Sequence, residues 1–295
     1  MFAQTPIIAY QRLSLPMESD SGISITIKRI DQVHSTISGN KWFKLKYNLI
    51  KAKSLGYSQL LSFGGAYSNH IDALAHAAYD FGFESIGIIR GDELAGRPLN
   101  PTLSRAQALG MRLEFISRAD YRLKHTDNYT TELKARYPNA YIIPEGGSNA
   151  LAVKGCEEML TEADQRNFDV IVCAVGTGGT FSGLINASGH GQSLIGFSAL
   201  KGDFLIEPVQ GWTGSAKHNW AIYDDSLFGG YGKFNKTLEA FIELMNKKYE
   251  LPLEPIYTGK AFYRMLAMIE QGNIAKGSRI LFMHTGGLQA FDRSK

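Results

Sequence analysis

A loop rich in glycine and threonine is the strongest candidate binding feature of the sequence. The loop consists of Gly176, Thr177, Gly178, Gly179 and Thr180, and it lies between an apolar run and a helical pattern. Glycines expose successive backbone N–H groups, and the start of a helix adds unpaired donors and the positive end of its dipole. The two threonine hydroxyls add further donors. We therefore expect this loop to bind an anion, most often a phosphate, rather than to be a bare turn.

The sequence around the loop restricts the kind of phosphate. A dinucleotide-binding fingerprint requires a third glycine, where this chain has Phe181, and an acidic residue about 20 residues further on. The stretch at 196–200, GFSAL, offers no acid at that distance. A P-loop requires Gly-Lys-Ser/Thr, which the loop lacks. A compact phosphomonoester fits the loop better than a nucleotide does.

A lysine at a predicted helix start could supply covalent chemistry. Lys41 follows Ser38, Gly39 and Asn40, so it faces the positive end of a helix dipole, which disfavours its charged form. Burial would lower its pKa further, and a neutral amine can form a Schiff base with an aldehyde. We expect the neighbouring lysines of the same stretch to be solvated; they are Lys44, Lys46, Lys51 and Lys53. An aldehyde cofactor with one phosphate suggests pyridoxal 5′-phosphate.

Strand-like and helix-like segments alternate along the chain. Apolar runs predict strands at 24–30, 60–63, 85–90, 112–116, 141–144, 169–175, 193–200 and 279–283. Helical patterns lie at 42–55, 67–81, 100–109, 129–136, 150–164, from about 180, and at 236–247. This alternation predicts an α/β fold with parallel sheets, whose ligands lie where strands lead into helices. The stretch 211–234 is long and irregular.

Length and composition restrict the class of protein. The 295 residues allow one large domain or two modest ones, and the net charge of +3 does not suggest nucleic-acid binding. No apolar run is long enough for a membrane span, and the first residues show no secretory signal. We expect Cys156 and Cys173 to be buried reduced thiols, and the scattered histidines predict no metal site. A cytoplasmic protein is the expectation.

Six motifs occur in the order typical of one enzyme family. They are SGNKWFKL, GGAYSNH, IPEGGSNALAVKG, GTGGT, IYTGKA and HTGG, and they span residues 38–287. In these motifs the chain resembles the 1-aminocyclopropane-1-carboxylate (ACC) deaminase/D-cysteine desulfhydrase family of pyridoxal-phosphate enzymes. The resemblance implies the tryptophan-synthase-β-like architecture, known as fold type II, with two open parallel-sheet α/β domains. A small domain at 55–148 would be inserted into a large one made of 1–54 and 149–295. It also implies a homodimer and a small amino-acid substrate.

The resemblance assigns roles to individual residues. Lys41 would be the Schiff-base lysine, Asn69 would bond the cofactor's ring oxygen, and the 176–180 loop would bind its phosphate. Ser68 would hold the substrate carboxylate or assist proton transfer. Tyr257 would stack on the pyridine ring, Thr258 would face the ring nitrogen, and Tyr231 matches a second active-site tyrosine. Three of these residues could instead have a purely structural role. Ser68 could be a helix cap, Tyr257 a core residue, and Tyr231 part of a glycine-rich turn.

Three positions point to one branch of the family. ACC deaminases typically have Gln, Glu and Leu where this chain has His70, Thr258 and Thr285. We therefore expect a β-eliminating lyase that converts D-cysteine to pyruvate, sulfide and ammonia, with His70 and Thr285 among its substrate contacts. His70 could equally be a structural histidine. A hydroxyl at the ring nitrogen makes a weaker electron sink than a carboxylate would, and this suffices when thiolate leaves from Cβ.

Several alternatives stay open at this point. The chain could be an ACC deaminase that forms 2-oxobutyrate, a cofactor-binding protein without turnover, or a nucleotide-binding module. The group that removes the Cα proton could be Lys41, Ser68 or Tyr231. Phe43 and Asp72 stand where the family usually has arginine, so either anion handling near the site or only the surface charge differs.

Overall fold

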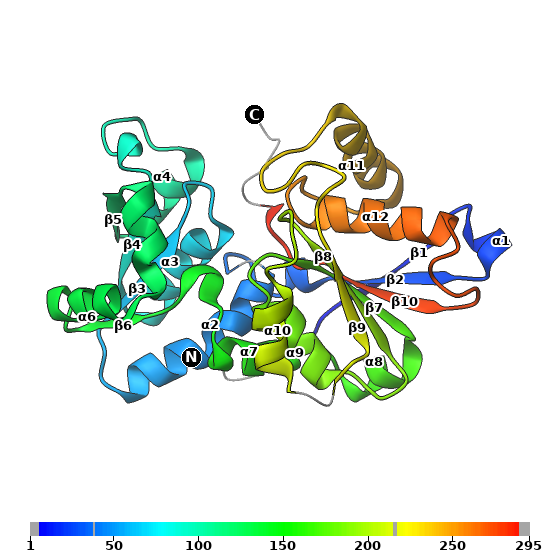
Figure 1. Cartoon of the computed structure of the whole chain (residues 1–295), viewed down its shortest axis with the longest axis horizontal. Coiled ribbons are helices and arrows are strands. Elements are labelled where there is room, and N and C mark those ends of the chain that lie inside the picture. The colour runs from blue at the N-terminus through cyan, green and yellow to red at the C-terminus, as the bar shows by residue number, and fades with distance from the viewer. Residues whose placement is uncertain (1–5, 38, 215–216, 289–295) are drawn as a thin grey trace.

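The computed structural model describes residues 6–37, 39–214 and 217–288, so Ser38 of the first motif lies outside it (Figure 1). The strands are β1 Tyr10–Leu13, β2 Ser24–Lys28, β3 Gln59–Gly64, β4 Glu84–Arg90, β5 Met111–Ile116, β6 Ala140–Ile142, β7 Val170–Val175, β8 Ser193–Ser198, β9 Trp220–Tyr223 and β10 Arg279–Met283. The α-helices are α1 Glu18–Ser21, α2 Asn40–Ser54, α3 Asn69–Phe81, α4 Pro101–Ala108, α5 Arg118–Arg122, α6 Asp127–Arg136, α7 Ala150–Glu157, α8 Glu162–Asn167, α9 Gly179–Ala187, α10 Ile206–Thr213, α11 Lys236–Tyr249 and α12 Thr258–Glu270.

The strands form two separate sheets. The larger sheet has the order β1-β2-β10-β7-β8-β9, and the smaller sheet has the order β5-β4-β3-β6. Among the described strands, β1 pairs antiparallel with β2, whereas the other neighbours pair in parallel. The predicted α/β class with two parallel-rich sheets is therefore confirmed.

Helices cover both faces of the larger sheet, as Figure 1 shows with α11 and α12 on one side and α9 and α10 on the other. Val170 and Val172 of β7 belong to the core beneath α11 and α12. Ile171 and Cys173 belong to the core that includes residues of α7, α9 and α10. Because both faces of β7 are buried, its sequence is an unbroken apolar run rather than an alternating one.

The smaller sheet is also buried on both faces. Side chains of α3 and α4 pack on one face, and Tyr121 and Leu133 from α5 and α6 pack on the other. Helix α2 contributes to the cores of both sheets, because Leu45 and Leu49 join the smaller core while Phe43 joins the larger one. All four strands of the smaller sheet lie within 55–148, and the domain division at those bounds stays a prediction.

The prediction of one continuous helix at 150–164 is wrong, because the structure has two helices there, α7 and α8. Thr161 begins α8: its hydroxyl accepts a hydrogen bond from the Asp164 N–H (3.2 Å), and the Asp164 carboxylate accepts one from the Thr161 N–H (2.8 Å). This reciprocal capping box satisfies donors at a new helix start and so ends the previous helix.

The structure also contains elements absent from the sequence prediction. Helix α12 repeats buried apolar residues at Ala261, Phe262, Met265 and Ile269, a helical spacing that the sequence already displays. Strands β1 and β9 are short edge strands of four residues each. Such strands carry little periodic signal, and β9 lies inside the stretch 211–234 that we expected to be irregular.

The two cysteines agree with the sequence prediction. Cys156 and Cys173 are both free and buried, as predicted. Burial raises the pKa of the Cys156 thiol to about 11, so it stays protonated at neutral pH. Within the described part of the chain, no helix combines the length and the apolar character needed to span a membrane.

A glycine in α7 allows this helix to pack closely on α2. A methyl group on Gly155 would lie 2.1 Å from the carbonyl oxygen of Phe43 in α2. No real contact between a Cβ and a backbone oxygen is that short, so a larger residue would force the helices apart. The helical Gly211 of α10 differs, because a methyl group there would meet nothing within 4 Å.

We predict that Gly155→Ala lowers the free energy of unfolding by about 1–3 kcal/mol, through strain in a packed core. Gly211→Ala, the matched control, should raise the free energy of unfolding by about 0.5–1 kcal/mol, because alanine is the better helix former. Chemical denaturation followed by circular dichroism measures both. Equal effects of the two substitutions would contradict the close packing of α7 on α2.

Candidate functional site

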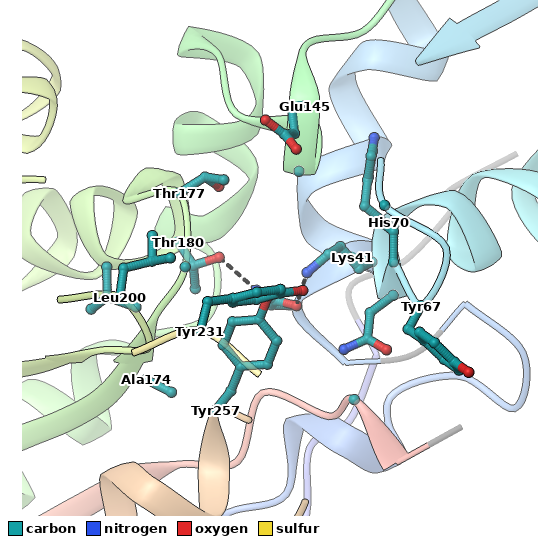
Figure 2. A pocket seen from close by; sticks show the side chains of 18 of the residues that line it. Lys41, Tyr67, His70, Glu145, Ala174, Thr177, Thr180, Leu200, Tyr231 and Tyr257 are labelled. Carbon is teal, nitrogen blue, oxygen red and sulfur yellow. Dashed lines mark hydrogen bonds between the residues drawn. The ribbon is translucent and has the colours of Figure 1, made fainter. Parts of the chain in front are cut away.

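A cavity of about 540 Å³ opens where loops from the two sheets meet (Figure 2). Its walls include the start of α2, the loop after β3, the loop after β7 and the turn after β10. These loops follow the carboxyl ends of parallel strands, where α/β folds bind ligands. The cavity therefore lies at the place that the strand–helix alternation predicts.

The backbone at Gly39 fixes the position of Lys41. Gly39 has a φ of 57°, and a methyl group there would lie 1.9 Å from the Thr285 carbonyl oxygen. That same oxygen accepts a hydrogen bond from the Asn40 N–H at 3.1 Å. Only glycine permits this approach, so α2 begins directly on the turn after β10 and Lys41 lines the cavity.

A short chain of hydrogen bonds connects Lys41 to the glycine–threonine loop. The Lys41 ammonium donates to Asn40 Oδ1 at 2.9 Å, and Asn40 Nδ2 donates to Thr180 Oγ1 at 2.8 Å (Figure 2). Burial lowers the pKa of Lys41 to about 8, although nearby Cys156, Cys173 and Glu254 favour the charged form. A neutral amine is therefore accessible near neutral pH, as the sequence predicts.

The loop at 176–180 has the backbone geometry of an anion site. Helix α9 begins after Gly178, whose φ is 83°, and no side chain caps it. The first bond within the helix runs from the Ser182 N–H to the Gly178 oxygen at 2.9 Å, so the preceding N–H groups have no partner inside the helix. Among the loop residues, Gly176, Thr177, Gly178 and Thr180 line the cavity, while Gly179 is buried behind its wall.

The prediction that Lys44 is solvated is wrong. Its side chain is 2% exposed and lines the cavity, one helical turn after Lys41. The Lys44 ammonium donates to Ser148 Oγ at 2.7 Å, Thr177 Oγ1 at 3.3 Å and the Gly146 carbonyl oxygen at 2.5 Å. Burial, with a smaller contribution from the charge on Lys41, lowers its pKa to about 7. Lys44 follows Lys41 by three residues, so the two side chains lie on the same face of the helix, and this spacing could have indicated that Lys44 also lies in the site.

His70 is a neutral histidine on the cavity wall. The Ser62 hydroxyl donates to the Ile143 carbonyl oxygen at 2.8 Å, so it can only accept from His70 Nε2, also at 2.8 Å. The proton therefore resides on Nε2. Burial and the charges of Lys41 and Lys44 hold the His70 pKa well below its usual value. Nδ1 is left as a buried acceptor without a hydrogen-bond partner among the described residues.

Ser68 and Asn69 lie at the start of α3 and line the cavity. Ser68 caps this helix, with its Oγ accepting from the Ile71 N–H at 3.3 Å. Its role as a cap is therefore real, and the residue also faces the cavity. Thr285, on the opposite turn, lines the same space. The structure thus brings together four sequence-predicted residues from three segments: Lys41, Ser68, Asn69 and Thr285.

Two tyrosines form an aromatic wall of the cavity. A methyl group on Gly176 would lie 3.1 Å from Tyr257 Cε1, so this ring rests against the glycine loop. The Tyr231 ring lies 6.2 Å from that of Tyr257, at 64° between the planes (Figure 2). Burial raises the pKa of Tyr257 well above its usual value, so it stays a neutral phenol.

Thr258 does not line the cavity. It is fully buried, and its hydroxyl donates to Glu254 Oε1 at 3.1 Å while accepting from the Glu254 N–H at 3.2 Å. The Glu254 carboxylate also accepts from the N–H groups of Ile256, Tyr257 and Thr258, at 2.6–2.9 Å. Glu254 therefore fixes the turn that presents Tyr257, a role that the sequence analysis missed.

A buried ion pair holds the loop of Tyr231. Lys260 Nζ lies 2.5 Å from Asp225 Oδ2 and donates to the Gly230 carbonyl oxygen at 3.0 Å. The Asp225 carboxylate also accepts from the N–H groups of Phe228 and Gly230. Because these contacts precede Tyr231 directly, they fix where this tyrosine enters the cavity.

The two departures from the family pattern lie inside the protein. Phe43 is fully buried in the core shared by α7 and α9, and Asp72 is 2% exposed and pairs with Arg105 at 3.2 Å. Neither residue lines the cavity. Because both residues are buried and lie outside the cavity wall, they alter neither anion binding in the site nor the surface charge.

Comparisons with known proteins show what the whole chain is similar to. Residues 1–286 match the family model described as "Pyridoxal-phosphate dependent enzyme". A Pyrococcus abyssi protein described as a putative ACC deaminase is 30% identical over 97% of this chain and 89% of its own. A D-cysteine desulfhydrase from Klebsiella pneumoniae is 30% identical over 98% and 93%. A crystal structure of an ACC deaminase homologue superposes with a TM-score of 0.83 at 27% identity, over 97% and 91%. The expected fold type II is confirmed.

The residues around the cavity fit pyridoxal 5′-phosphate. Lys41 offers an amine of lowered pKa, and Tyr257 offers a flat aromatic face. The uncapped start of α9 and the Lys44 ammonium offer donors to a phosphate. A buried Lys44 surrounded by neutral partners also lacks a counter-charge, which a phosphate would provide.

We predict that Lys44→Met weakens the binding of pyridoxal 5′-phosphate by about 10- to 100-fold, the value of one charge-assisted contact. The binding of pyridoxal, which lacks the phosphate, should change little. Titration followed by visible absorption measures both ligands. Lys51→Met, which removes an exposed lysine of the same helix, is the control. Equal weakening of the two ligands would contradict a phosphate contact for Lys44.

Proposed function

Because the chain belongs to the family of pyridoxal-phosphate-dependent enzymes, we propose that it is a β-eliminating lyase that converts D-cysteine to pyruvate, sulfide and ammonia. The observation that carries this proposal is the convergence of Lys41, the uncapped start of α9 and the Ser68–Asn69 loop on one cavity. The bound cofactor supplies an electron sink for the pair left at Cα when the substrate loses a proton.

Lys41 has two tasks in this proposal. It holds the cofactor covalently, and its free amine is a base for the Cα proton. A pKa of about 8 suits a base that works near neutral pH, because a useful fraction is unprotonated. Ser68 and Tyr231 also line the cavity and stay alternatives for the proton transfer.

The start of α3 binds the substrate carboxylate in this proposal. Its backbone N–H groups and the positive end of its dipole favour an anion, and Asn69 lies beside them. The aromatic face of Tyr257 supports the pyridine ring, and His70 offers Nδ1 as an acceptor for a donor on the ligand. The 176–180 loop and Lys44 hold the phosphate.

The choice between β-elimination and ring opening depends on few residues. The relatives described as putative ACC deaminase are 29–32% identical to this chain, and those described as D-cysteine desulfhydrase are 30% identical, so sequence identity does not choose between the two reactions. Position 258 carries a threonine, but its side chain lies outside the cavity wall and its hydroxyl donates to Glu254, so this position does not decide between the two reactions. Loss of thiolate from Cβ needs less stabilisation at Cα than opening a carbon ring does. Thr285 and His70 line the cavity, and because ACC deaminases typically have Leu and Gln at these positions, the two residues support β-elimination.

We predict sulfide and pyruvate in equal amounts from D-cysteine, and no 2-oxobutyrate from ACC. The Cα proton goes to the base, the Cβ–S bond breaks with its electron pair on sulfur, and water converts the released 2-aminoacrylate to pyruvate and ammonia. Methylene blue detection of sulfide and chromatography of the keto acids measure the products. Lys41→Met, with free cofactor added, controls for chemistry in solution.

Two results would contradict the proposed function. Formation of 2-oxobutyrate from ACC without sulfide from D-cysteine would place the chain with the deaminases. Absence of both products from protein that binds the cofactor would favour binding without turnover. The homodimer and the cytoplasmic location stay predictions.

A further inference from the structure

The wall of the cavity formed by the smaller sheet holds a second feature for an anion. Arg90 ends β4 and lines the cavity. A methyl group on Gly65 would lie 3.6 Å from Arg90 Nη2, so the guanidinium lies beside the start of the loop that leads to Ser68. The start of α3 already provides for one carboxylate. Arg90 is an additional cation next to it, and the proposed function does not use it.

Other charged groups on this wall are paired. Arg118 lies 2.7 Å from Glu93, and Lys124 lies 3.3 Å from Glu145. The Glu145 carboxylate also accepts a hydrogen bond from the Tyr121 hydroxyl at 2.6 Å. The two acidic side chains that line the cavity are therefore already neutralised by their own partners.

Arg90 differs from these groups. Within residues 6–37, 39–214 and 217–288, no carboxylate lies within ion-pair distance of it. Its guanidinium carbon lies 5.8 Å from the centre of the Tyr121 ring, which holds the side chain without neutralising its charge. Of the other cavity cations, Lys41 and Lys44 are used by the aldehyde and the phosphate of the cofactor. Arg90, an exposed side chain on the cavity wall, is thus a cation that neither the cofactor nor these ion pairs use.

We infer that Arg90 binds an anionic group on Cβ of a ligand, such as a sulfonate, phosphate or carboxylate, so that preferred substrates carry a sulfonate or phosphate leaving group there in addition to the α-carboxylate. The guanidinium fork matches the planar or tetrahedral oxygens of such groups. Cysteine meets this requirement when its thiol is ionised, and the leaving sulfur then takes a proton from water, so that hydrosulfide is released. The inference rests on the proposed function, because it names the substrate class of the same site.

The chemical step for such a substrate needs no added oxidant or reductant. With cysteate, the base takes the Cα proton and the Cβ–S bond breaks. The bonding pair leaves with sulfur as sulfite, and the Cα–H pair becomes the new Cα–Cβ double bond. Hydrolysis of 2-aminoacrylate then gives pyruvate and ammonia. With O-phosphoserine, the Cβ–O bond breaks in the same way and inorganic phosphate leaves.

The test compares anionic and neutral substrates in the holoenzyme and its variants. Both enantiomers of cysteate, O-phosphoserine and β-chloroalanine are assayed as pyruvate release. The wild-type enzyme should have the higher kcat/KM for an anionic substrate. Arg90→Met should lower that value about 10- to 100-fold and leave β-chloroalanine nearly unchanged. Arg122→Met, at an exposed α5 arginine outside the cavity wall, is the control.

A binding measurement separates this inference from the proposed function. Aspartate carries a Cβ carboxylate but no leaving group, and its binding is followed by the change in visible absorption of the cofactor. Arg90→Met should weaken the binding of aspartate about 10- to 100-fold and leave the binding of alanine unchanged. Equal weakening of aspartate and alanine would assign Arg90 to the α-carboxylate and overturn the inference, as would a wild-type preference for β-chloroalanine. Arg90-dependent binding of aspartate without pyruvate from any substrate would instead overturn the proposed function.

Discussion

The close approach of Gly39 to the Thr285 carbonyl oxygen determines the geometry of the whole site. A side chain at position 39 has no room, so α2 must begin on the turn after β10. This contact places the first turn of α2 beside the start of α9, and the Asn40 side chain connects the two at Thr180. Lys41 is then held at the carboxyl ends of parallel strands, where the larger sheet opens to a ligand. Without that contact, the amine and the phosphate loop would not face one cavity.

The electrostatics of the cavity follow from the same arrangement. Lys41 and Lys44 are one helical turn apart, Lys44 is buried and Lys41 is partly buried, and desolvation lowers the pKa of Lys41 to about 8 and that of Lys44 to about 7. The partners of Lys44 are hydroxyl and carbonyl oxygens without charge. Two cations without a counter-ion are unfavourable in such surroundings, so the site is prepared for a ligand with an aldehyde and an anion. His70, which is neutral, lies on the same wall and adds no charge of its own beside the two lysines.

Sequence patterns were sufficient for features that depend on neighbours along the chain. The apolar run of β7, the glycine–threonine loop and Lys41 at a helix start are local, and their expected places agree with the structure. Lys44 was misjudged because its burial depends on Ser148 and Thr177, more than 100 residues away. Glu254 and the pair of Asp225 with Lys260 were missed for the same reason, since their roles lie in holding other segments. The lack of a partner for Arg90 is also a property of the folded chain alone.

The central claim is that the amine of Lys41 carries the cofactor. Reduction of the holoenzyme with borohydride, followed by proteolysis and mass spectrometry, tests it most directly because reduction fixes the cofactor to the lysine that holds it. We predict one modified peptide, with the pyridoxyl phosphate mass on Lys41 and none on Lys44. Modification at another lysine, or no modified peptide from protein that has bound the cofactor, would contradict the account.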